Sequence, residues 1–300
     1  MSAAPRRLYI VCTREWGTRG NATGEKQEKG TMCIATWIWQ SHPVYQLLLL
    51  LNRDEYHTRP TKPVEWWGEG DRKMILGGRD ELAGGTWLGC TRDGRFAFLT
   101  NFREPGPLPV AKSRGVLPLR FLQNNQSPLD CAAEIAKEAD EYNGFNLVLA
   151  DVHAKTMVYI SNRPKGEPVI RVVPPGLHVL SNANLDTPWP KAQRLSKNFD
   201  ESVRRNGGEE IPLSQMVHEL MEDTAKADWS MLPQTGCDPE WEYDLSSIFI
   251  DTDTKVGRYG TRSMAAISVK AQGEVDFYER YLENSLWKEH LTHYCIEKLQ

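Results

Sequence analysis

The chain has 300 residues, of which 40% are hydrophobic and 25% are charged, and its formal net charge is −4 at pH 7. These values are typical of a globular protein, and the length is sufficient for a sizeable core. The weak negative charge and the lack of a long basic run argue against a nucleic-acid partner. The longest apolar run, with five leucines at 47–51, is far shorter than the ~20 residues of a transmembrane helix.

The cysteines are scattered and form no CxxC pair, which is a pattern unlike that of a disulfide scaffold. There are six of them: Cys12, Cys33, Cys90, Cys131, Cys237 and Cys295. This usage favours a reducing compartment. Residues 1–31 lack the apolar segment of a secretory signal, so we expect a disordered extension there. The arginines of this extension also fit a mitochondrial presequence, and the two interpretations stay open.

From Cys33 onward, the first part of the chain is rich in strand patterns. Two strands, 33–40 and 45–52, are separated by a turn, and the polar, proline-rich segment 53–70 is expected to be a loop. Three short strands follow at 73–78, 86–91 and 95–102, and Asp93-Gly94 between the last two is a strong hairpin signal. We therefore expect an antiparallel sheet over this part of the chain.

The second part alternates between helices and strands. Helical spacing of apolar residues predicts helices over 113–123, 127–142, 187–205 and 213–223, the second of them capped by Ser127. Strands are expected at 145–152, 156–162, 176–182, 245–250, 262–271 and 273–282. No composition shift divides residues 32–300, which we interpret as one α+β domain with two stacked antiparallel sheets and helices outside.

Seven short motifs occur in a fixed order along the chain. They are MCI (Met32–Ile34), NRDE (Asn52–Glu55), GGTWLG (Gly84–Gly89), LTNFREP (Leu99–Pro105), YNGFNLVLAD (Tyr142–Asp151), LSNANLDTPWPK (Leu180–Lys191) and YGTR (Tyr259–Arg262). Each motif is weak alone, but the ordered set resembles the transport and Golgi organisation protein 2 family, also called the NRDE family. That family begins at the MC pair, whereas this chain carries 31 residues before it.

The resemblance implies a fold and a set of roles. The implied fold is the four-layer αββα sandwich of the amino-terminal nucleophile (Ntn) hydrolases, in the cysteine branch that cleaves amide bonds. The implied roles are in Golgi organisation and protein secretion, lipid metabolism and haem trafficking, with a cytoplasmic location and Golgi or mitochondrial association. We expect a carrier of a small apolar or acyl ligand or of haem, with no required cofactor, and protein partners in the secretory pathway.

An enzymatic alternative depends on Cys33. In an Ntn hydrolase the first residue supplies a thiol that attacks a carbonyl group and a free α-amine that acts as the base. An internal cysteine has only an amide nitrogen, so Cys33 can act in this way only if Met32 begins the chain and is removed, or if the chain is cleaved before Cys33. The alternative function is then a cysteine amidase or acyl hydrolase acting on C–N bonds.

The other residues of such a site are conditional on that free amine. Asp54 could hold the α-ammonium group and Arg53 could favour the thiolate, but neighbouring residues of an extended strand point to opposite faces. Asn101 and Asn182 follow strands and could donate hydrogen bonds to an oxyanion. Arg262 could bind a carboxylate or steady the thiolate.

Each candidate also has a purely structural interpretation. Cys33 fits a small buried strand residue, the NRDE charges fit ion pairs that close a turn, Asn101 and Asn182 fit turn residues, and Arg262 fits a salt-bridge partner. The tryptophans of WIW and EWW could line a pocket for a flat ligand or fill the core.

Histidine usage predicts no metal site. If residues 290–293 were helical, His290 and His293 would share a face, but two ligands without a second cluster do not make a zinc site. Haem needs only one or two axial ligands and an apolar pocket, so the sequence leaves a haem ligand open.

Overall fold

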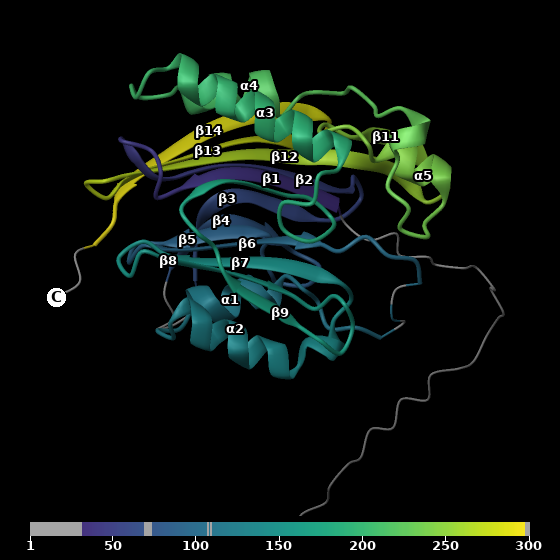
Figure 1. Cartoon of the computed structure of the whole chain (residues 1–300), viewed down its shortest axis with the longest axis horizontal. Coiled ribbons are helices and arrows are strands. Elements are labelled where there is room, and N and C mark those ends of the chain that lie inside the picture. Colours follow the sequence, from purple (N-terminus) through teal and green to yellow (C-terminus); the bar gives the residue numbers. More distant parts are fainter. Residues whose placement is uncertain (1–31, 69–73, 107, 109, 298–300) are drawn as a thin grey trace, which may run out of the picture.

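Two antiparallel sheets make up the centre of the molecule in the computed structural model, which describes residues 32–68, 74–106, 108 and 110–297 (Figure 1). The expected disordered extension, 1–31, lies outside the described residues. Helices cover the outer face of each sheet, so the layers are ordered helix, sheet, sheet, helix (Figure 1). The structure thus confirms the α+β class and the αββα arrangement expected from the sequence.

The first sheet has strand order β10-β1-β2-β12-β13-β14, and β11 pairs with β12 at one end. Its strands are β1 (Met32–Trp39), β2 (Tyr45–Tyr56), β10 (Gly176–Leu180), β11 (Asp251–Thr254), β12 (Gly257–Lys270), β13 (Glu274–Glu283) and β14 (Leu286–Cys295). The amino-terminal strand β1 therefore lies inside the sheet, between β10 and β2.

The second sheet has strand order β3-β4-β5-β6-β7-β8-β9. Its strands are β3 (Thr61–Trp67), β4 (Ile75–Asp80), β5 (Leu88–Thr91), β6 (Arg95–Asn101), β7 (Phe145–Asp151), β8 (Thr156–Ser161) and β9 (Val169–Val172). Each strand pairs with the next one in sequence, as in a meander.

The helices fall into two groups. Helices α1 (Val116–Leu122) and α2 (Pro128–Lys137) pack on β6 and β8 of the second sheet, whereas α3 (Pro190–Arg205) and α4 (Leu213–Leu220) pack on β10 and β12 of the first. The short helix α5 (Pro239–Asp244) and two 3-10 turns, Ala139–Glu141 and Trp229–Met231, complete the helical segments that the described residues form. As expected, Ser127 caps α2, and its hydroxyl accepts the backbone N–H of Asp130.

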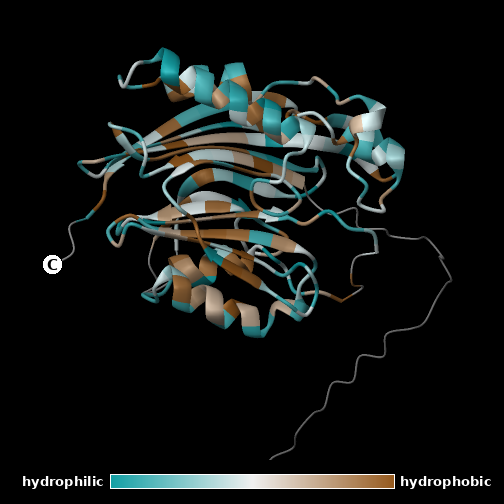
Figure 2. Cartoon of the chain, in the orientation of Figure 1, coloured by the Kyte–Doolittle hydropathy of each residue, from teal (hydrophilic) through white to brown (hydrophobic). Residues whose placement is uncertain are grey.

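Alternation along the strands separates two kinds of core. In β1 and β2 the odd-numbered residues, such as Trp37 and Leu49, pack between the two sheets, while even-numbered ones, such as Leu48, pack under α3 and α4. Figure 2 shows the hydrophobic residues concentrated in the strands, with a largely hydrophilic surface on α3 and α4. The inter-sheet packing of Trp37 and Trp39 supports the core interpretation of the WIW stretch.

Four details of the expected secondary structure are wrong. The expected loop 53–70 contains the end of β2 and all of β3, and the strands of 33–102 are divided between the two sheets. Pro63 is tolerated because β3 is an edge strand with a register irregularity between Lys62 and Glu65. The expected strand 245–250 has no ladder; its buried apolar residues lie in turns. Residues 290–293 belong to β14, so His290 and His293 face opposite sides.

Candidate functional site

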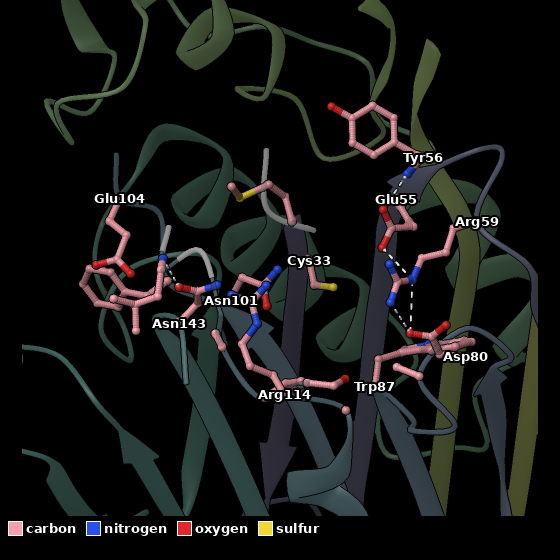
Figure 3. A pocket seen from close by; sticks show the side chains of 18 of the residues that line it. Cys33, Glu55, Tyr56, Arg59, Asp80, Trp87, Asn101, Glu104, Arg114 and Asn143 are labelled. Carbon is pink, nitrogen blue, oxygen red and sulfur yellow. Dashed lines mark hydrogen bonds and ion pairs between the residues drawn. The ribbon is translucent and has the colours of Figure 1, made fainter. Parts of the chain in front are cut away.

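A cavity of about 690 Å³ is lined by residues of both sheets and lies at the end of the sheets where β1 begins. Its wall combines strand residues, such as Cys33 and Glu55, with loop residues, such as Glu104, Arg114 and Asn143 (Figure 3). Buried polar side chains, including Arg53, Glu55 and Asn101, lie in the wall, whereas the apolar residues Leu82 and Val110 are 68% and 95% exposed. The cavity therefore has buried charged groups in its inner wall and exposed apolar residues, together with Lys112, at its rim, and its volume suits a small organic ligand.

The strand register places Cys33 in the cavity wall. Cys33 lies opposite Arg53 in the antiparallel pair β1–β2, so both side chains are on the face that points toward the second sheet. Glu55, two residues further along β2, is on the same face and also lines the cavity. The face of β2 that carries Arg53 and Glu55 is therefore the one that points into the cavity, and Asn52 and Asp54 are on the other face.

The Cys33 thiol is not activated in the chain that retains Met32. It is 2% exposed, and burial, with a further contribution from the carboxyl group of Asp54, raises its pKa to about 12. The nitrogen of Cys33 is a peptide nitrogen inside a strand, and the N–H of Met32 donates to the hydroxyl of Tyr259 at 2.7 Å. This thiol is therefore protonated at neutral pH and has no α-amine to act as a base.

Arg53 is held by an aromatic ring and a carboxylate. Its guanidinium group lies 4.2 Å from the centre of the Trp87 ring, and its Nη2 is 3.9 Å from an oxygen of Glu55. Trp87 can reach this position because Gly78 lacks a side chain; a Cβ there would lie 2.3 Å from the indole ring. Trp87 belongs to the GGTWLG motif, which therefore contributes to the site by supporting Arg53.

Asp54 faces away from the cavity, toward the helix layer. It is fully buried, accepts a hydrogen bond from Thr261 at 2.7 Å, and feels the charges of Lys191 and Arg103. Burial raises the pKa of Asp54 to about 7 and lowers the pKa of Lys191 to about 7. Asp54 is therefore on the opposite face of β2 from the Cys33 side chain.

The two asparagines are connected to each other. Asn101, at the end of β6, lines the cavity, whereas Asn182 lies behind it and donates from its side-chain amide to the backbone oxygen of Asn101 at 2.9 Å. Asn182 also accepts the backbone N–H of Arg103 through its own carbonyl oxygen. Asn101 is thus in the wall of the cavity, and Asn182 supports the backbone that carries it.

Arg262 lies at a register shift in β12 and contacts the β2–β3 turn. Its Nη1 donates to the carbonyl oxygens of Tyr56, at 3.2 Å, and of Arg59. Burial and the neighbouring charge of Arg53 lower its pKa to about 10, so it stays cationic at neutral pH. Arg262 is not among the residues that line the cavity, and Cys33, Arg53 and Asn101 are the three sequence-predicted site residues that are.

The structure adds Arg114, a cavity residue that sequence reasoning missed. Its side chain extends toward the region of Cys33 and Asn101 (Figure 3), and its Nη1 donates to the backbone oxygen of Gly144 at 2.9 Å. The N–H of Gly144 donates to Glu104, which is also paired with Arg163. No motif in the sequence distinguishes Arg114, which the sequence placed inside the expected helix 113–123, whereas α1 begins only at Val116.

Two glycines allow the Arg114 loop to approach the wall. A Cβ on Gly85 would lie 2.4 Å from the carbonyl carbon of Gly115, and the backbone N–H of Thr86 donates to the carbonyl oxygen of Gly115 at 3.0 Å. The second glycine of GGTWLG is therefore required where two backbones meet. This contact fixes the loop that carries Arg114 against the second sheet.

No metal centre was found among residues 32–68, 74–106, 108 and 110–297, where groups of three or more His, Cys, Asp or Glu suited to hold an ion are absent. Within the same ranges, the side chains that line the cavity include no histidine. If haem were bound there, the lining residues with side chains able to hold its iron would be Met32, Cys33, Tyr56 and Cys237.

Fold and cavity together define an αββα protein with a ligand-sized cavity at one end of its sheets. Residues 32–284 match the family described as Transport and Golgi organisation 2. The Transport and Golgi organization 2 homolog of Mus musculus is 32% identical, over 89% of this chain and 100% of its own length. The Bos taurus homolog is 35% identical over 85% of this chain and 94% of its own. The chain therefore belongs to the Transport and Golgi organisation 2 family.

One solved structure can be aligned with most of this chain. The Caenorhabditis elegans N-acylethanolamine-hydrolyzing acid amidase ortholog matches 73% of this chain and 98% of its own length, with 13% identity and a TM-score of 0.38. That similarity is too low to bear on function. Among the described residues, no helix has the length and apolar character needed to cross a membrane.

Proposed function

We propose that this protein binds a small amphiphilic ligand in the cavity between its sheets and carries it without chemical change. The observation that carries the proposal is the combination of buried charged side chains in the inner wall with exposed apolar residues at the rim of the cavity. An amphiphile has the matching division, with a polar head and an apolar chain. The protonated, buried state of Cys33 favours binding over catalysis in the chain that retains Met32.

A binding assay with a cavity-blocking variant tests this proposal. The probe is a monoacylglycerol carrying a nitrobenzoxadiazole fluorophore, titrated into delipidated protein. Ser113 lines the cavity, so Ser113→Trp should weaken probe binding by at least about tenfold, as expected when a bulky side chain occupies the ligand's space. Ser214 is exposed on α4, and Ser214→Trp serves as the matched control.

The outcomes separate clearly. Saturable binding at micromolar probe, lost in Ser113→Trp and kept in Ser214→Trp, supports a carrier, as does recovery of the probe unchanged by mass spectrometry. Absence of saturable binding, or equal binding in both variants, rejects it. Haemin is the second ligand to titrate, and a shift of its absorption that disappears in Ser113→Trp would make haem a cargo of this cavity.

The second candidate function is a cysteine amidase or acyl hydrolase, favoured by the presence of Cys33, Arg53 and Asn101 in one cavity wall. With a free amine, the Cys33 thiol would lose its proton to that amine and attack the acyl carbonyl. The amine would return the proton to the leaving nitrogen, and water would then hydrolyse the thioester. Asn101, which lines the cavity, would donate a hydrogen bond to the oxyanion. Asp54 and Arg262 do not line the cavity and would act through the residues that do.

A chain engineered to begin at Cys33 tests this candidate. It should cleave an acyl amide that the chain beginning at Met1 leaves intact, and Cys33→Ala should abolish the cleavage. Activity that survives in Cys33→Ala removes this cysteine from the mechanism. Sequencing the native amino terminus by mass spectrometry then decides which of the two chains exists in cells.

For the cellular role, the names of the relatives refer to transport and Golgi organisation, and we propose that this chain shares that role. The proposed location is the cytoplasm, with association to the Golgi or to mitochondria, and the proposed partners are secretory-pathway proteins. Restored secretion of a reporter in cells depleted of their own family member tests the role. If Ser113→Trp restores secretion as well as the unaltered chain, the cavity is not needed for it.

A further inference from the structure

The cations that line the cavity differ in whether a carboxylate neutralises them. Arg59 pairs with Asp80 at 2.6 Å. Lys112, at the rim, pairs with Glu138 at 3.2 Å and with Glu141 at 2.5 Å. These two cations are therefore already matched by acidic side chains of the protein.

Arg114 is the exception. Among the described residues no carboxylate oxygen lies within 4.0 Å of it, and the hydrogen bond it makes is to the neutral backbone oxygen of Gly144. Glu104, the acidic residue of the same wall, is bound by Arg163 through both of its oxygens. Burial lowers the pKa of Arg114 to about 10, and the group is still cationic at neutral pH. A guanidinium ion thus faces the cavity with donors that no carboxylate of these residues takes up.

Arg53 provides an independent observation of the same kind. Its side chain is 3% exposed, and its Nη1 has no hydrogen-bond partner among the described residues. A buried donor without a partner is costly, and charged donors are the costliest. The Nη2 of Arg53 lies 3.9 Å from an oxygen of Glu55, the carboxylate beside it. Arg53 belongs to the cavity wall, and its unused Nη1 is buried within that wall.

Arg53 lies opposite Cys33 in the pair β1–β2, and the Arg114 side chain extends toward Cys33 (Figure 3), so both guanidinium groups are in the same part of the cavity. We infer that Arg114 and Arg53 bind the oxyanionic head group, carboxylate or phosphate, of a single-chain amphiphile. The planar guanidinium fork matches both kinds of oxyanion. The apolar chain then runs outward past Leu82, Leu108 and Val110 at the rim. This inference rests on the proposed carrier function and adds the chemistry of the head.

Displacement of the fluorescent monoacylglycerol tests the head-group preference, because that probe is uncharged. The competitors share one C16 chain: hexadecanoate, hexadecyl phosphate and hexadecanol. We expect at least one anionic competitor to bind about 10- to 100-fold more tightly than the alcohol, as charge-assisted hydrogen bonds in a buried site allow. The order of the two anions identifies the oxyanion that the site prefers.

Variants assign the preference to residues. Arg114→Gln should lose most of the advantage of the anion while binding hexadecanol as before, and Arg114→Lys, which keeps the charge, should retain part of it. Arg204, an exposed arginine on α3, provides Arg204→Gln as the matched control with full preference. Arg53→Lys, which keeps the charge but loses the fork, is the second test, and unfolding midpoints verify that each variant is folded.

Failure of the inference differs from failure of the carrier proposal. If the probe binds and all three competitors displace it equally, or if Arg114→Gln weakens the alcohol as much as the anion, the head-group assignment is wrong and the carrier proposal stands. If neither the probe nor any competitor binds, the carrier proposal is rejected, and the head-group assignment is rejected with it.

Discussion

Cys33 and Arg53 are directly opposite each other in the antiparallel pair β1–β2, and both side chains point into the space between the sheets. The pairing brings Cys33 of the MC pair and Arg53 of the NRDE motif, which are 20 residues apart in the sequence, to one place in the fold. It also assigns opposite environments to neighbouring residues, because Arg53 faces the cavity while Asp54 faces α3 and its Lys191. A one-residue slip of this register would exchange the two.

The first prediction concerns the reactivity of Cys33 in the chain that retains Met32. With a pKa of about 12, its thiolate population at neutral pH is roughly 3000-fold below that of an ordinary cysteine of pKa about 8.5. Alkylation by iodoacetamide at pH 8, followed by peptide mass spectrometry, should therefore label Cys33 far more slowly than Cys295. Cys295 is exposed and serves as the reference within the same molecule. Equal labelling rates would show that Cys33 is activated or accessible.

The second prediction is a pH dependence of stability caused by Glu279. This buried carboxyl group accepts hydrogen bonds from Ser263 at 2.5 Å and from the N–H of Val64 at 2.7 Å. Burial raises its pKa from 4.5 to about 7, so the folded state holds a proton that the unfolded state releases between these values. The stabilisation from the protonated form is complete below pH 4.5 and is lost as pH rises through 7, by roughly 3 kcal/mol in all.

Glu279→Gln isolates this contribution, because glutamine is neutral and can keep an acceptor for the N–H of Val64. Urea unfolding of both proteins at pH 5 and pH 8 gives the comparison. Between pH 5 and pH 8 the free energy of unfolding should fall more for the unaltered protein than for the variant. The stability of the variant relative to the unaltered protein should therefore be higher at pH 8 than at pH 5. Parallel pH profiles would mean that Glu279 titrates normally. Other groups, such as Asp54, titrate in both proteins and cancel in the difference.

The third prediction concerns the buried ion pair of Arg103 with Glu242. The two side chains are 1% and 3% exposed, and Arg103 also lies over the ring of Trp189. Glu242→Gln leaves a buried guanidinium group without its counter-charge, so the free energy of unfolding should fall by about 3–5 kcal/mol. The pair Arg258–Asp251 is half exposed. Asp251→Asn, its matched control, should cost no more than about 1 kcal/mol. Similar losses in urea unfolding for the two variants would contradict the burial argument.

The fourth prediction links a glycine to the ligand site. A Cβ on Gly144 would lie 2.7 Å from an oxygen of Glu104 and 2.8 Å from the Cβ of Phe102, so Gly144→Ala must displace the backbone. The displacement should lower the free energy of unfolding by about 1–3 kcal/mol, as for other overpacked sites. It should also reduce the preference for an anionic competitor, because the carbonyl oxygen of Gly144 positions Arg114. Full stability together with full preference would show that the loop tolerates a side chain.

The fold class was within reach of the sequence because strand and helix periodicities are strong in most segments. The capped start of α2 at Ser127 and the hairpin at Asp93-Gly94 are local signals, and the structure contains both elements. Strand β3 was missed because polar and proline residues dominate an edge strand that needs few buried side chains. The segment 245–250 was misassigned because an apolar run is buried equally well in turns.

The candidate site was only partly accessible for a different reason. Residue types selected Cys33, Arg53 and Asn101, which do line the cavity, but they could not decide between the two faces of β2. The sequence could not single out Arg114, because its place in the cavity wall, without a carboxylate within 4.0 Å among the described residues, is a property of the folded arrangement. The requirement for Gly85 likewise arises only from its contact with Gly115, 30 residues away.

Met32 has a double position: its backbone is held by Tyr259, and its side chain packs against Trp241, Leu245 and Ile250 while also lining the cavity. Removing this residue would therefore do more than uncover an amine at Cys33. It would also remove a side chain from the cavity wall and enlarge the cavity by the volume of a methionine side chain. Maturation of the amino terminus would then change the shape of the ligand space and the chemistry of the thiol in a single step, so the two forms of the chain should differ in which ligands they accept.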